Sequence, residues 1–369
     1  MKKLLLVIIL ALLMSQFFII PCYAEVSVDA LADMAGAQEV EDAIPDDAKQ
    51  ISGGLGKDGT YDAQSALSRL WERVVNTAAD ELQTNLKSAA ALVAIALCSA
   101  LAGSFTKNST IRDYICIAGV CAAAGMLIGS VDGLVEQTSK TLSRMSDYSR
   151  AALPAVFTAV AACGAVVSAS ARYAAVSIAI DVLMSMAQSV VIPLTYTYLA
   201  LSLSNNLFDN AVLKTCQRFS KWLATTFMTV FTILFSGYIG LTGIVTSGVD
   251  AVAARTARTV ISTALPVVGG IISDAAATVL SAAGMIKNST GALSLVAVAA
   301  LCAQPFVVLS VKLLLFRAAA TMCDMVPNEK LAAFINDVGT ALSLLLGLVG
   351  CCAIMLFISF TSAIKVVTA

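Results

Sequence analysis

The sequence predicts an all-helical integral membrane protein that crosses the bilayer several times. Of its 369 residues, 59% are apolar and only 13% are charged, whereas soluble domains carry about 25% charged residues. Long charge-free windows recur after residue 88, and a helix is the natural structure for such windows in lipid because it satisfies its own backbone. This composition excludes a soluble enzyme, a disordered linker and a nucleic-acid-binding protein.

Residues 1–24 are predicted to be a signal peptide. Lys2 and Lys3 form the charged start, Leu4–Ile20 the apolar stretch, and Cys22–Ala24 a small-residue cleavage site. Two alternatives remain: an uncleaved anchor helix, and a lipoprotein attached through Cys22, to which the preceding Pro21 is a poor fit. In each case the chain after residue 24 begins outside the membrane.

Residues 25–88 form an acidic extracytoplasmic segment with 13 acidic and 5 basic side chains. Its second half is predicted to be an amphipathic helix that runs into the first span, because apolar residues recur there at steps of three and four. These residues are Leu67, Leu70, Trp71, Val74, Ala78, Leu82 and Leu86. The preceding glycine-rich run is not a phosphate-binding loop, since Asp58 follows Lys57 where Ser or Thr is required.

Residues 89–369 are predicted to be a multi-span transmembrane domain of about seven helices. Each window is long enough, or nearly so, to cross about 30 Å of hydrocarbon. With the N-terminus outside, the counts of Lys and Arg do not settle which ends face the cytoplasm. The windows are Ser88–Thr106, Tyr114–Val131, Ala151–Ala171, Val182–Phe208, Trp222–Val249, Asn288–Val311 and Val338–Ile364.

The segment at about 255–287 is predicted to be a re-entrant or interfacial helical hairpin. Pro266, the pair Gly269 and Gly270, and Asp274 interrupt it, which leaves two halves of about 20 Å that are too short to span alone. The glycine pair permits a sharp reversal, and the proline disfavours an unbroken helix. One kinked span that carries a buried Asp274 is the alternative.

Ionisable residues within or beside the spans are candidate functional positions, because burial in lipid is costly and such residues often mark pathways. They include Arg172, Asp181 and Lys312. Arg172 and Asp181 are about 13 Å apart along a helix, so they would not pair directly. Capping or pairing inside a helix bundle is the expected role, and a proton or ion relay is the alternative.

Small residues predict helix packing, and the remaining chemistry is sparse. Gly125, Gly129 and Gly133 form two overlapping GxxxG steps that favour close helix contact within the chain or in a homo-oligomer. The cysteines form no CxxC pair and are interpreted as small apolar filler. The chain contains no histidine, which excludes His-based catalysis and most zinc and haem ligation. We therefore expect no enzyme activity, no metal and no cofactor.

The run RTARTVISTALPVVGGIISDAAATVLSAAGMIKNSTG (Arg255–Gly291) resembles the signature region of the stage III sporulation protein AE family, as does the preceding stretch Lys221–Arg258. The resemblance covers most of residues 150–365 and weakens over 25–88. It implies a component of a secretion-like channel between mother cell and forespore, required for endospore formation and late forespore gene expression.

The resemblance further implies a location in the mother-cell membrane that surrounds the forespore. Expected partners are other proteins of the same sporulation operon, including an ATPase in trans, and a forespore membrane protein across the intermembrane space. No catalytic residues carry over from the family. A secondary transporter or permease that uses a broken helix at 255–287 is the alternative, although such proteins usually show repeated halves.

Overall fold

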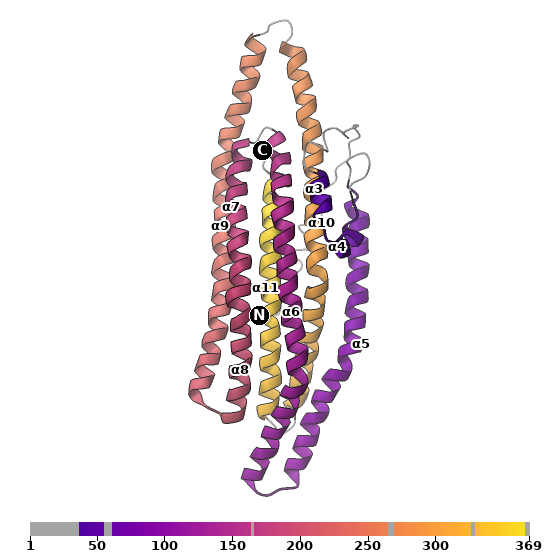
Figure 1. The fold of residues 1–369 in the computed structure, drawn as a ribbon, viewed down its shortest axis with the longest axis vertical. Coiled ribbons are helices and arrows are strands. Elements are labelled where there is room, and N and C mark those ends of the chain that lie inside the picture. Colours follow the sequence, from indigo (N-terminus) through magenta and orange to yellow (C-terminus); the bar gives the residue numbers. More distant parts are fainter. Residues whose placement is uncertain (1–36, 55–60, 164–165, 265–268, 326–328, 366–369) are drawn as a thin grey trace.

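The computed structural model describes residues 37–54, 61–163, 166–264, 269–325 and 329–365. All elements within these ranges are helices, most of them aligned with the long axis of the molecule (Figure 1). Six helical segments there are long and apolar enough to cross a membrane. The prediction of an all-helical polytopic membrane protein is confirmed, with six candidate spans where about seven were expected. The predicted signal peptide and Pro266 lie outside the described residues.

The acidic segment contributes two short helices and the start of a long one. α3 (Ala37–Asp42) and α4 (Asp46–Ser52) precede α5 (Ala63–Ser104). Asp62 caps α5, because its Oδ1 accepts hydrogen bonds from the backbone N–H groups of Gln64 and Ser65, both at 3.1 Å. These bonds, chiefly the one from Ser65, lower the pKa of the Asp62 carboxyl. The amphipathic helix and the first span therefore belong to one 42-residue helix.

α6 (Ser109–Ala162) is one 54-residue helix, and this overturns the predicted span at Ala151–Ala171. That window holds the end of α6, and α7 begins at Val166. Charged residues separate the second predicted window, Tyr114–Val131, from the third, Ala151–Ala171, and they lie within this helix. They stay helical because they have partners, such as Glu136 with Lys140 at 2.7 Å, an i,i+4 pair that stabilises a helix.

α7 (Val166–Met186) and α8 (Ile192–Phe208) form one continuous rod. A π-helical turn, Ala187–Val191, joins them directly before Pro193. Proline has no N–H and its ring crowds the carbonyl four residues earlier, so a wider turn at this point lets the helix continue.

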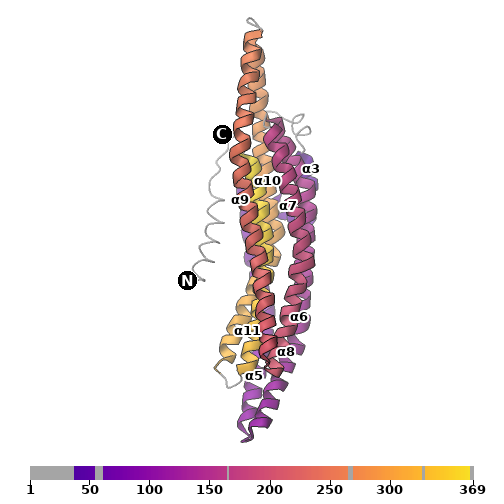
Figure 2. The same cartoon turned by 90° about the vertical axis from the view of Figure 1, so that its left-hand side faces the viewer.

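The remaining helices are α9 (Ala211–Ala264), α10 (Gly269–Cys323) and α11 (Glu329–Lys365). α11 lies at the centre of the bundle and contacts α6 to α10. The predicted halves at 255–287 are not separate short helices, since they continue directly into helices of 54 and 55 residues. α9 and α10 rise together beyond the other helices, as both views show (Figures 1 and 2). At 1.5 Å per residue each is about 80 Å long, far more than a bilayer needs.

Candidate functional site

Two buried cations hold the C-terminal turn of α11. Arg172 on α7 donates from Nη1 to the carbonyl oxygen of Ser362 at 3.0 Å and to its Oγ at 2.9 Å. Lys287 on α10, whose exposed fraction is 2%, donates from Nζ to the carbonyl oxygen of Ile364 at 2.6 Å. The last carbonyls of a helix lack intrahelical donors and carry a partial negative charge. Arg172 and Lys287 therefore tie α7 and α10 to the end of α11.

The predicted residue Asp181 lies on α7 and pairs across to α6. The Nε of Arg150 donates to its Oδ1 at 2.9 Å. Both side chains are substantially exposed, so the pair contributes little to stability. As expected from their separation along the helix, Arg172 and Asp181 bind different partners.

A buried polar cluster surrounds Asp337, a residue that the sequence reasoning missed. Its carboxylate accepts hydrogen bonds from four side chains on two helices, α8 and α9, and we call Asp337 and these four donors the Asp337 cluster. The donors are Tyr198 Oη at 3.0 Å, Ser202 Oγ at 2.6 Å, Asn206 Nδ2 at 3.4 Å and Gln217 Nε2 at 2.8 Å. The cluster joins the turn between α8 and α9 to the start of α11. Its only sequence signal was an acid directly before the seventh predicted window, which begins at Val338.

The predicted glycine positions lie on the outside of α6. A Cβ atom built on Gly125, Gly129 or Gly133 would meet no atom within 4 Å. Helix packing through these glycines thus stays a prediction about contacts with another chain. Gly269 and Gly270 begin α10, and Asp274 follows on the same helix; the surroundings of these three residues lie outside what the structure describes.

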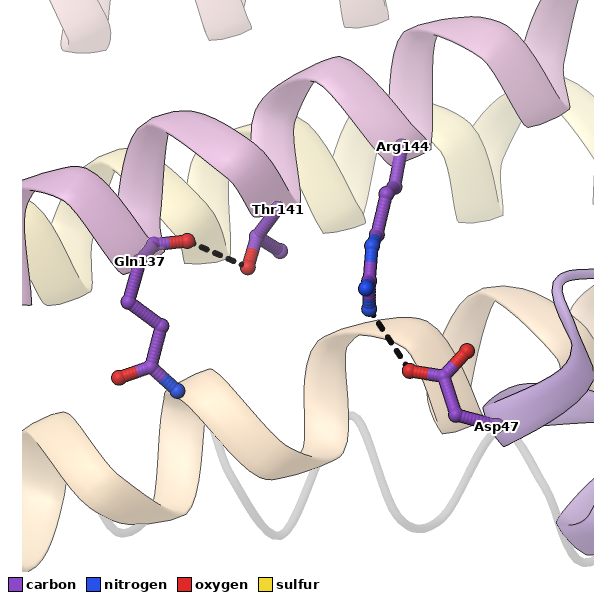
Figure 3. A network of polar contacts seen from close by, with 4 residues as sticks. All are labelled: Asp47, Gln137, Thr141 and Arg144. Atoms are coloured by element: carbon purple, nitrogen blue, oxygen red, sulfur yellow. Dashed lines mark hydrogen bonds and ion pairs between the residues drawn. The ribbon is translucent and has the colours of Figure 1, made fainter.

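A polar surface on α4, α5 and α6 encloses a cavity of about 270 Å³. Arg144 on α6 donates from Nη1 to Oδ2 of Asp47 on α4 at 2.7 Å, and Thr141 bonds the carbonyl oxygen of Gln137 one turn earlier (Figure 3). The opposite wall comes from α10, where Pro305 leaves the carbonyl of Leu301 without its usual helical donor. We call Asp47, Arg73, Gln137, Lys140 and Arg144, which all line the cavity, the polar face.

These groups can bind, cap and orient, but they do not form a recognisable reaction centre. Among the described residues, no three His, Cys, Asp or Glu side chains lie close enough to hold a metal ion. The Asp337 carboxylate accepts from two hydroxyls and two amides on neighbouring helices, so its hydrogen bonds hold α8 and α9 to α11. The hydrogen bonds and ion pairs described above therefore hold helices together and form polar surfaces within a membrane protein.

Comparisons with known proteins agree with this picture. The family model described as stage III sporulation protein AE matches residues 57–367. The stage III sporulation protein AE of Bacillus subtilis (strain 168) is 20% identical over 236 residues, which are 64% of this chain and 59% of that protein. The match therefore spans less than two thirds of the relative's length. No solved structure matches the chain. Because the family model covers most of the sequence, the chain belongs to the stage III sporulation protein AE family, and its role lies in sporulation.

Proposed function

We propose that this protein is a membrane component of a multiprotein, secretion-like channel between mother cell and forespore, required for endospore formation and late forespore gene expression. The observation that carries the proposal is the family match over residues 57–367 of a chain whose described residues include six candidate spans. Helices of about 80 Å extend well past a bilayer of about 30 Å. Such extensions suit a protein that must meet partners outside its own membrane.

The predicted extracytoplasmic start of the chain supports one orientation, in which α5 begins outside the membrane and ends in the cytoplasm. The turn between α5 and α6, the turn between α8 and α9, and the neighbouring ends of α10 and α11 lie at the same end of the molecule (Figure 1). By the positive-inside rule, an end rich in Lys and Arg belongs in the cytoplasm. The helix ends and turns there carry Lys107, Arg112, Lys214, Arg218, Lys221, Arg317 and Lys330, while helix ends toward the opposite side carry Arg69, Arg172, Arg255, Arg258 and Lys365, so the count of cations does not separate the two ends.

The opposite end then projects into the intermembrane space from the mother-cell membrane that surrounds the forespore. The end of α9 and the start of α10 reach farthest on this projecting part (Figures 1 and 2). Partners would be other proteins of the same sporulation operon, with an ATPase in trans as the energy source, and a forespore membrane protein met across the gap. The alternative is a secondary transporter or permease that uses the region 255–287, where α9 ends at Ala264 and α10 begins at Gly269.

A deletion tests the proposal. In the organism that carries this chain, an in-frame deletion should lower the count of heat-resistant spores and silence a reporter of late forespore expression, while mother-cell expression before engulfment stays normal. A copy expressed only in the mother cell should restore spores. Restoration by a forespore-only copy, or wild-type spore counts after deletion, would contradict the proposal.

A further inference from the structure

Side-chain contacts show that segments of α6, α9, α10 and α11 lie at about the same height along the axis of the bundle, a height that we call this level. Thr232 on α9 lies 2.8 Å from Cys351 on α11, measured from Oγ1 to Sγ. A Cβ atom on the adjacent Gly350 would meet Phe306 of α10 at 3.8 Å. One turn away on α10, the Sγ of Cys302 lies 3.7 Å from the Sδ of Met145 on α6. The α9 segment near residue 232 and the α6 segment near residue 145 therefore lie at the same level.

On α9, this level lies inside the hydrocarbon for every possible placement of the span. No charged residue occurs between Lys221 and Asp250, and a span needs about 20 residues. Any such span between residues 222 and 249 contains residues 230–241. The outer face of α9 is apolar there, with Ile233 65% and Leu234 66% exposed. This side of the bundle suits contact with lipid chains.

On α6, the same level is charged. Met145 is adjacent to Arg144, and Lys140 lies about 8 Å away along the helix axis. The side chains of Lys140 and Arg144 are 70% and 57% exposed. Both belong to the polar face around the cavity, and Figure 3 shows Arg144 there with Asp47. α4 and α5 lie on the side of the bundle away from α9 (Figure 1).

The bundle thus has an apolar side and a charged side at one membrane depth. A charged side chain that faces hydrocarbon is strongly unfavourable, so such residues point into a protein interior or a water-filled space. The centre of a protein–protein interface is depleted of charged residues. The polar face carries both signs, stays substantially exposed and borders an open cavity. Water therefore accommodates these side chains better than hydrocarbon or a protein partner does.

We propose that the polar face on α4, α5 and α6 lines a water-filled passage at the depth of the membrane, with α9 turned toward lipid. The inference depends on the proposed channel role in one respect: it identifies the water-filled space beside the polar face with the passage of that channel. By this inference, the chain itself forms part of the wall of the passage that polar cargo would follow, and its partners do not form that wall alone.

Cysteine labelling tests the inference in membranes from sporulating cells, opened by freeze–thaw so that both sides are accessible. In a background with the exposed Cys98, Cys121 and Cys216 replaced by alanine, the variants are Lys140→Cys and Gln137→Cys on the polar face. Matched controls are Ile233→Cys and Leu234→Cys on α9. The probe is a charged maleimide that does not enter lipid.

We expect the maleimide to label both polar-face variants to completion and to leave both α9 variants unlabelled until detergent is added. Labelling at all four positions would overturn the inference, because this level would then lie outside the hydrocarbon. No labelling at residues 137 and 140 would also overturn it, because lipid or protein would then cover the polar face. Either result is independent of whether a deletion mutant makes spores, so a failure here is distinct from a failure of the proposed function.

Discussion

The Nζ of Lys287 lies 2.6 Å from the carbonyl oxygen of Ile364, so that an almost fully buried cation on α10 binds the last turn of the central helix. Arg172 reaches the same turn from α7. Both cations meet the negative end of the α11 dipole. The end of α11 is thereby fixed between two neighbouring helices.

Lys287→Met should lower the thermal unfolding midpoint of the detergent-solubilised protein. A hydrogen bond to a charged group contributes about 1.5–3 kcal/mol, and the Ile364 carbonyl would lose its donor. The matched control is Lys214→Met on an exposed face, which should leave the midpoint unchanged. Combined with Arg172→Met, the loss should be less than additive because both residues hold one turn. Equal midpoints for Lys287→Met and the control would refute the role of this contact.

Asp337→Ala should destabilise the protein more than Asp324→Ala, an exposed acid beyond the end of α10. The alanine would leave buried donors of the Asp337 cluster unpaired, and each unpaired buried donor costs about 1–3 kcal/mol. The assay is the monodisperse fraction that survives heating, followed by size-exclusion chromatography. If both variants survive alike, the cluster does not hold the α8–α9 turn to α11.

Gly53→Ala should loosen the acidic segment from α5. The glycine has φ +69° at the end of α4, and a Cβ atom there would lie 2.7 Å from Nη2 of Arg69. With its ψ of −168°, this backbone conformation is nearly restricted to glycine and costs an L-residue about 1–3 kcal/mol. Trypsin should cleave after Lys49 faster in this variant. Gly103→Ala, where the nearest contact is an ordinary 3.6 Å, should cleave at the wild-type rate, and a similar rate in both would contradict the prediction.

The cap at Asp62 should make part of the stability of α5 depend on pH. Its pKa is lowered in the folded state by the hydrogen bonds from Ser65 and Gln64. A group with a lowered pKa stabilises the fold above its unfolded value, about 3.9, and this contribution is lost as the pH falls through the folded value. The gap in unfolding midpoint between wild type and Asp62→Ala should therefore be present at pH 7 and shrink below about pH 4. A gap that is constant with pH would exclude ionisation as its source.

Replacing Gly269 and Gly270 with leucine should abolish sporulation while leaving protein abundance normal. The pair begins α10, directly after the reversal from α9, and glycine permits backbone conformations that leucine avoids. Heat-resistant spore counts and an immunoblot provide the two measurements. The control is Gly284→Leu, since a Cβ atom at that position meets nothing within 4 Å. Wild-type spore counts in the double variant would disprove a role for the reversal.

Much of the fold could be predicted from charge-free windows, because lipid imposes a length and a backbone rule that sequence displays directly. The windows Val182–Phe208, Asn288–Val311 and Val338–Ile364 each fall within a candidate span. The error at Ala151–Ala171 came from treating charge as a break. Charged residues on α6 stay helical when they find partners, as Arg144 does with Asp47, 97 residues away in sequence.

The candidate site was less predictable for the same reason. Asp337 and Lys287 border apolar windows, where they resemble ordinary flanking charges. Their roles arise from helices that are distant in sequence, since Gln217 reaches Asp337 and Ile364 receives Lys287. A single sequence carries no signal for such pairing. Arg172 and Asp181 were identified because an isolated charge inside an apolar stretch is conspicuous on its own.

Co-purification from sporulating cells tests the central claim most directly. The chain would carry an affinity tag, be extracted in mild detergent after engulfment, and be analysed for associated proteins. The proposed channel role predicts a large assembly that contains an ATPase from the same operon and a forespore membrane protein. Recovery of the chain alone, with solute uptake after reconstitution into vesicles, would contradict that role and favour a transporter.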